Sequence, residues 1–108
     1  MHLQTRLFVV LGHAGCGAVK AAIGGKFHDV QYHSRIAVLL ENIGPALDGL
    51  DRSMPAAALL SAAVEANVRC TVRQLLESPE GKARAAEGRV RLVGAVYDLA
   101  SGVVRFLE

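Results

Sequence analysis

The sequence predicts an α/β fold with a small, mostly parallel sheet, flanking helices and a C-terminal β-hairpin. Three observations predict it: a short apolar segment of strand formers at 7–11, a long middle region with helical periodicity, and two further strand patterns at 89–99 and 103–107 joined by a turn. Because helices separate the first two strands, these strands are expected to pair in parallel. The 108 residues are long enough for one domain, 1–108, with a workable core.

Composition excludes several classes of function. With 52% hydrophobic and 20% charged residues the chain is globular rather than disordered. Its net charge of +2 comes from scattered residues and it has no Trp, so no nucleic-acid interface is expected. No apolar run reaches the roughly 18 to 20 residues that span a membrane. The run after Arg6 continues into glycines and a helix, so it is read as a core strand of a cytoplasmic protein and not as a signal peptide. The two cysteines could form a disulfide, but Cys16 is a candidate ligand and Cys70 lies in a helical segment, so a reducing cytoplasm is favoured.

The amino-terminal third is predicted as strand, turn, helix and loop. The continuous apolar run Leu7 to Leu11 is typical of a strand buried on both faces. The turn that follows is rich in glycine, which accepts backbone angles that other residues resist. A helix from Cys16 to Ile23 is expected to end at Gly24 and Gly25, with a loop over 26–33.

Two helices are expected in the middle. Ser34 is a plausible N-cap for the first, and Pro45 ends or kinks it. Ser53 or Met54 caps the second and longest, with Pro55 in its first turn. Its apolar residues recur at helical spacing and form one stripe suited to packing on a sheet. They are Leu60, Val64, Val68, Val72, Leu75 and Leu76.

The last third completes the sheet. Ser78 and Pro79 end the long helix, and a short polar helix over 80–87 is expected to end at Gly88. Alternating apolar residues over 89–99 predict a strand. After a turn at 100–102, residues 103–107 are expected to return antiparallel as an edge strand, with Asp98 shaping the hairpin.

His13 and Cys16 are the residues in this pattern best suited to bind a metal ion or to take part in catalysis. They follow the first strand at its carboxyl end, where sites form in open α/β sheets. Cys16 falls near a helix start, where unpaired N–H groups favour a thiolate, and imidazole and thiolate are good zinc ligands. A tetrahedral zinc site needs two more ligands, and His-x-x-Cys by itself is a common chance pair. Cys16 could instead be a nucleophilic or redox thiol activated by His13.

The segment 12–20 (GHAGCGAVK) resembles the second zinc motif of the β-class carbonic anhydrases. The resemblance extends to residues 67–79 in the long helix and to residues 94–104 in the hairpin. It implies an incomplete β-carbonic-anhydrase-like fold in which His13 and Cys16 are zinc ligands. The family's first zinc motif, Cys-x-Asp-x-Arg, does not occur in this sequence. The chain is therefore interpreted as a domain truncated at its N-terminus, with its catalytic residues unassigned.

The resemblance implies a zinc lyase that interconverts carbon dioxide and bicarbonate. The chain alone is expected to be weakly active or inactive, because a third ligand must come from elsewhere. The alternative is a non-catalytic truncated relative that serves as an oligomerising module. In both cases a homodimer or higher oligomer is expected, because an unpaired strand edge invites a second chain.

Three other residues are candidate ligands. Cys70 lies off the long helix's apolar stripe, where a small packing residue is expected. His28 and His33 fall in a predicted loop, where histidines are usually solvated, although they could serve a partner chain.

Overall fold

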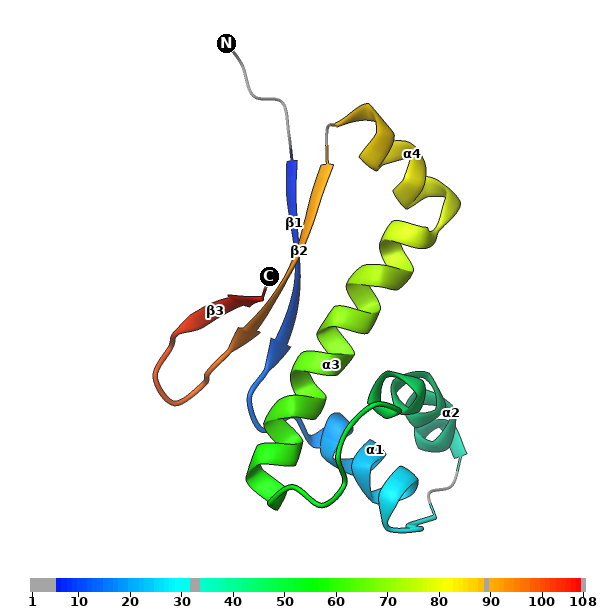
Figure 1. Ribbon diagram of the computed structural model, residues 1–108, viewed down its shortest axis with the longest axis vertical. Coiled ribbons are helices and arrows are strands. Elements are labelled where there is room, and N and C mark those ends of the chain that lie inside the picture. Colours follow the sequence, from blue (N-terminus) through cyan, green and yellow to red (C-terminus); the bar gives the residue numbers. More distant parts are fainter. Residues whose placement is uncertain (1–5, 32–33, 89, 108) are drawn as a thin grey trace.

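The computed structural model describes residues 6–31, 34–88 and 90–107, which form three strands, four α-helices and a short 3₁₀ helix (Figure 1). In chain order the elements are β1 (Arg6–His13), α1 (Gly17–Phe27), α2 (Ser34–Ile43), η1 (Gly44–Leu47), α3 (Ala56–Glu77), α4 (Pro79–Glu87), β2 (Val90–Tyr97) and β3 (Val104–Leu107). The α/β class predicted from the sequence is confirmed.

The sheet has the strand order β1-β2-β3. β1 pairs with β2 in parallel along its whole length, from Arg6 opposite Val90 to His13 opposite Tyr97. β3 pairs antiparallel with the second half of β2 only, from Gly94 opposite Leu107 to Tyr97 opposite Val104. The predicted parallel pair and closing hairpin are therefore both correct, and one long edge of β1 has no neighbouring strand among the described residues.

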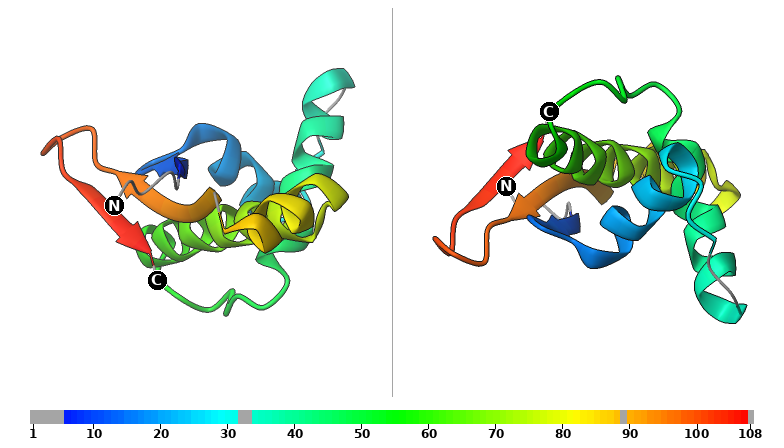
Figure 2. Two further views of the ribbon diagram at one scale, coloured as in Figure 1. Left: turned by 90° about the horizontal axis from the view of Figure 1, so that it is seen from above. Right: turned by 90° about the horizontal axis from the view of Figure 1, so that it is seen from below.

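Helix α3 covers one face of this sheet (Figure 2). Gly12 of β1 and Gly94 of β2 lie directly against it, since an added Cβ would come within 2.6 and 2.7 Å of the Val68 side chain. Because strand side chains alternate between faces, the residues next to these glycines point away from α3. On that outer face Leu11 and Phe106 are 56% and 57% exposed.

The expectation that β1 is buried on both faces is wrong for this chain. Leu7, Phe8 and Val9 are all exposed, and Val10 is only partly buried. The physical reason is position: β1 is an edge strand of the described sheet, and α3 is the helix that packs along it, on one face.

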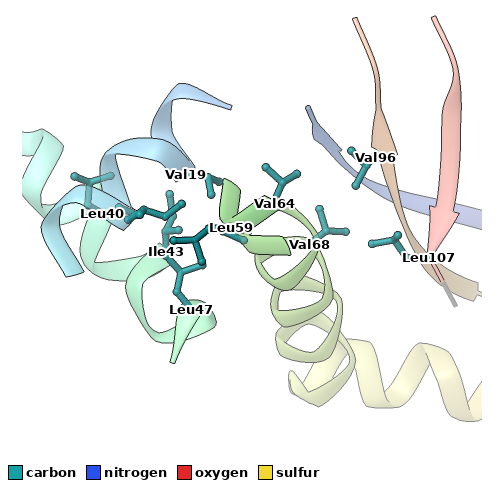
Figure 3. Packing of buried hydrophobic residues seen from close by; sticks show 12 residues of the cluster. Val19, Leu40, Ile43, Leu47, Leu59, Val64, Val68, Val96 and Leu107 are labelled. Atoms are coloured by element: carbon teal, nitrogen blue, oxygen red, sulfur yellow. The ribbon is translucent and has the colours of Figure 1, made fainter. Parts of the chain in front are cut away.

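The buried core has two connected parts (Figure 3). One lies between α1, α2, η1 and the first turns of α3, and the other lies between α3 and the sheet. Leu47 of η1 and Ala63 of α3 are fully buried. The remaining members of the cluster are Val19, Ala22, Ile23, Leu40, Ile43, Leu59, Val64, Val68, Val96 and Leu107. Because α3 contributes to both parts, it connects the packing of α1, α2 and η1 with the packing of the sheet.

Helix α1 is longer than the sequence predicts. It continues through Gly24 and Gly25 to Phe27, so the predicted stop and the start of the predicted loop are wrong. The Gly24 carbonyl accepts hydrogen bonds from the N–H groups of His28 (3.1 Å) and Val30 (3.1 Å). The left-handed residue that follows the helix is Asp29, with φ of 55°. Glycine permits that conformation but does not require it, and Phe27, at the end of the added turn, packs against the core cluster.

Other boundaries agree within one or two residues. Helix α2 ends at Ile43 as Pro45 predicts, and η1 continues the chain. Pro55 is the residue that precedes α3 instead of lying in its first turn. Ser78 ends α3 and caps α4, since its hydroxyl accepts a hydrogen bond from the Gly81 N–H (3.0 Å). Gly88 closes α4 in the left-handed conformation, with φ of 69°.

The predicted stripe of α3 is only partly buried. Of its six residues Val64 and Val68 are buried, whereas Leu75 and Leu76 are 43% and 38% exposed. The buried face of α3 also includes Leu59 and Ala63, which lie outside the predicted stripe. The last turn of α3 thus extends beyond the core.

The overall shape is elongated, with extents of 53 × 33 × 24 Å and a radius of gyration of 15.7 Å. A compact domain of this length has a radius of gyration near 13 Å. The larger radius of gyration of this chain is consistent with a sheet that a helix covers on one face. Within the described residues, no helix is both long and apolar enough to cross a membrane.

Candidate metal centre

The connection from β1 to α1 places His13 and Cys16 on the two sides of a tight turn. His13 is the last residue of β1 and lies opposite Tyr97 of β2, so it belongs to the strand and not to the turn as predicted. The next residue extends the ladder, because the Ala14 N–H donates to the Tyr97 carbonyl at 2.8 Å. Gly15 then reverses the chain with φ of +73°, a conformation that side chains other than glycine resist. The sharp turn between His13 and Cys16 therefore depends on Gly15.

Cys16 is the N-cap residue of α1, as the sequence predicts to within one residue. Its carbonyl accepts the Lys20 N–H at 3.0 Å, which begins the helical pattern. No acidic residue lies in the first turn and no side chain caps it. The first N–H groups of the helix and its dipole therefore favour an anion at this end.

The two donors differ in exposure. Cys16 is half-buried and packs against the core cluster, whereas His13 is exposed. Cys16 thus has a fixed place in the fold, and His13 lies at the open end of the strand.

Among the residues that the structure describes, no group of three or more His, Cys, Asp and Glu side chains could hold a metal ion. Cys70 is half-buried on α3 and His28 follows α1, so neither forms such a group with the pair. His33 lies outside the described residues. Imidazole and thiolate are the correct donor types for zinc, but two donors leave a tetrahedral shell half filled. The described residues therefore offer donors for two of the four positions of a tetrahedral zinc site.

A cavity of about 530 Å³ opens beside the turn. Its lining joins Ala14 and Gly15 to Ser61 of α3 and to Asp98 and Arg105 of the hairpin. No local sequence pattern associates Ser61 or Arg105 with this region, because both residues lie far from the turn in the chain. Arg105 forms an ion pair with Glu65 that ties the hairpin to α3.

Asp98 performs the structural role predicted for it. Its carboxylate accepts the Ala100 N–H at 3.0 Å, and its own N–H donates to the Val103 carbonyl at 2.9 Å. These bonds hold the turn between β2 and β3.

Comparison with known proteins identifies the family. The family model described as carbonic anhydrase matches residues 1–104. Among solved structures, a β-carbonic anhydrase from Coccomyxa in complex with acetazolamide shares 26% identity with a TM-score of 0.82, over 98% of this chain and 48% of that one. Wild-type CafD, a β-carbonic anhydrase of Aspergillus fumigatus, shares 25% identity with a TM-score of 0.68, over 95% and 57% of the two chains.

A structure described as one of two tetrameric β-carbonic anhydrases from Sordaria macrospora has the same fold, with a TM-score of 0.77 at 19% identity, over 98% of this chain and 54% of that one. No curated protein matches the sequence.

The fold and the family match together define the class: the chain belongs to the β-class carbonic anhydrase family. It spans about half the length of the solved structures it resembles. The family match agrees with the resemblance found around His13 and Cys16.

Proposed function

We propose that this chain contributes one half of a zinc lyase centre for the reversible hydration of carbon dioxide to bicarbonate. The observation that supports the proposal is the placement of His13 and Cys16 on either side of the Gly15 turn, at the carboxyl end of a parallel strand, in a chain of this family.

Each residue of the turn has a distinct role in this proposal. Cys16 provides a thiolate next to the first N–H groups of α1, and His13 provides an imidazole nitrogen from the end of β1. Gly15 sets the direction of the chain between them. Bound zinc would lower the pKa of a coordinated water to about 7 and so supply hydroxide at neutral pH.

The remaining ligand and the groups that orient carbon dioxide come from outside the described residues. The described residues provide two donors of the right type, and no group of three or more potential ligands occurs among them. We expect them to be provided by further polypeptide that packs at the open edge of β1, next to His13.

The second candidate is a non-catalytic oligomerising module. It is favoured by the exposed outer face and free edge of β1, which can act whether or not zinc binds. The two candidates differ in whether His13 and Cys16 bind a metal.

Cobalt substitution tests the first candidate. Co²⁺ added to the reduced chain is expected to produce a thiolate-to-cobalt charge-transfer band, which Cys16→Ser abolishes and His13→Ala weakens. Zinc affinity should fall steeply in both variants, because each lost donor removes half of the ligands that this turn provides.

Cys70→Ser and His28→Ala are the matched controls and should keep the band. An unchanged band in Cys16→Ser, or its loss in Cys70→Ser, would locate metal binding elsewhere in the chain and overturn the assignment.

A further inference from the structure

A second cavity lies between helix α1 and the first turns of α3, and neither His13 nor Cys16 lines it. We call it the α1–α3 cavity. Its volume is about 690 Å³, which is within the range of cavities that bind small organic molecules. Its polar lining residues are Lys20, His28 and Arg52, and its apolar lining residues include Ile23, Met54 and Leu60.

The cavity follows the length of α1. Gly17, Lys20 and Gly24 line it from one side of the helix, because they are spaced three and four residues apart, and His28 lines it just beyond the helix end. From residue 17 to residue 28 an α-helix rises by about 16 Å. The first turns of α3 lie beside α1 and form the facing wall (Figure 1). An elongated ligand therefore fits this cavity better than a compact one.

The wall along α1 and α3 is apolar. Ile23 and Leu59 are buried members of the core cluster, and Met54 and Leu60 are partly buried and pack against it. Core packing therefore holds most of this wall in place before a ligand binds. The flexible thioether side chain of Met54 can adjust to the shape of a hydrocarbon chain.

Arg52 is held in position at the carboxyl end of α1. Its Nη2 donates a hydrogen bond to the Phe27 carbonyl at 2.8 Å, and its guanidinium carbon lies 5.8 Å from the centroid of the Phe27 ring. A guanidinium group has five N–H donors in a planar fork that matches the two oxygens of a carboxylate. His28, which follows Phe27, adds a ring N–H donor to the same end of the cavity.

The charge of the cavity has one sign. No acidic residue is among the described residues that line it. Asp29 and Asp51 are neighbours of His28 and Arg52 in the chain but do not line the cavity, and the Asp51 carboxylate accepts hydrogen bonds from Ser53. Lys20 takes part in none of the ion pairs found in the described part of the chain, so it adds a second positive charge. Charge complementarity therefore favours an anionic ligand.

We propose that the α1–α3 cavity binds a long-chain carboxylate. The carboxylate group binds at Arg52 and His28, and the hydrocarbon chain lies along the apolar wall that Ile23, Met54 and Leu60 form. The fixed guanidinium selects the head group, and the length and apolar character of the wall select the chain. The proposal does not depend on zinc, because neither candidate zinc ligand lines the cavity.

Dodecanoate is the probe that tests the proposal. When it is titrated into the full chain, the NMR signals of the Ile23, Met54 and Leu60 methyl groups should shift and saturate. Arg52→Gln should weaken the affinity by about tenfold or more, because the head group loses hydrogen bonds to a charged partner. Arg91→Gln is the matched control, since Arg91 is exposed on β2 outside the cavity, and it should bind as the parent does.

A second variant tests the cavity without changing Arg52 or its contacts with Phe27. Ala56→Trp places a large ring in the lining at the exposed start of α3 and should abolish binding. Ala58→Trp is its control, because Ala58 is exposed in the same helical turn but does not line the cavity. Thermal unfolding of each variant checks that its fold is intact.

Related ligands separate the contribution of the head group from that of the chain. Dodecanol should bind at least about tenfold more weakly than dodecanoate, because it lacks the charge that Arg52 recognises. Dodecylammonium should not bind, because its charge is repelled by Lys20 and Arg52. Acetate should not bind either, because it has no hydrocarbon chain to bury. The affinity for dodecanoate should be the same with and without added zinc.

Four results would overturn the proposal. Equal affinities for dodecanol and dodecanoate would show that the carboxylate is not recognised. Unchanged binding in Ala56→Trp, or shifts confined to Leu11 and Phe106, would place the ligand on the outer face of the sheet. A dependence on zinc would place it at the His13–Cys16 turn. Tighter binding of a peptide with an apolar C-terminus would assign the cavity to a protein partner.

Discussion

Gly12 of β1 lies so close to Val68 of α3 that a Cβ on the glycine would come within 2.6 Å of Val68 Cγ2 and 3.3 Å of Val64 Cγ1. No ordinary contact is that short. The last residues of β1 before His13 are therefore positioned by direct contact between the glycine backbone and the side chains of α3. Gly94 makes the same kind of contact from β2, with 2.7 Å to Val68 Cγ1.

We expect Gly12→Ala to destabilise the fold by about 1 to 3 kcal/mol, because the added methyl group must displace α3 or force Val68 from its rotamer. Chemical denaturation monitored by circular dichroism measures the change. Gly44→Ala is the control, since an added Cβ there meets nothing within 4 Å. Equal stabilities of the two variants would show that α3 moves freely over the strand.

We expect the purified chain with added zinc to hydrate carbon dioxide far more slowly than a complete enzyme. Two ligands bind zinc weakly, and the described residues offer no third. Stopped-flow measurement with a pH indicator tests this, with the Coccomyxa enzyme as the positive control. Turnover near that of the control would mean that the chain completes its own centre.

We expect the chain to self-associate through the outer face and free edge of β1, where Leu7 and Leu11 are 58% and 56% exposed. Tetrameric neighbours such as the Sordaria macrospora structure are consistent with association. Leu11→Lys should shift the mass measured by light scattering toward the monomer. The control is Val38→Lys on α2, since Val38 is equally exposed (60%) but lies away from the sheet. A parent chain that is already monomeric and unfolds cooperatively would contradict the expectation.

Ser53 holds the pKa of Asp51 below its ordinary value, first through its hydroxyl, which donates to the carboxylate at 2.6 Å, and then through its N–H at 2.9 Å. A lowered pKa in the folded state means that the stabilisation is fully present above the ordinary pKa and is lost as pH falls through the lowered one. Ser53→Ala should raise the pKa of Asp51 without restoring it fully, because the N–H remains. An NMR titration of the carboxyl carbon measures it, with Ser101→Ala as control.

Local sequence patterns predicted most elements of this fold. The strand before Gly12, the helix ends at Ser78 and Gly88 and the turn at Asp98 each depend on residues that are close in the chain, and the structure confirms them. The turn with His13 and Cys16 was predicted for the same reason. Where packing outweighs local preference the predictions were wrong, as at Gly24, where α1 continues.

The sequence by itself determined the order of elements, the parallel pair and the strand-turn-helix that carries the two donors. Only the tertiary structure decided that β1 is an exposed edge strand and that residues of α3 and the hairpin line the cavity beside the turn. It also decided that His28 and Arg52 line one cavity. The physical reason is that burial and juxtaposition depend on which elements cover one another, whereas caps, turns and periodicity depend on neighbours in the chain.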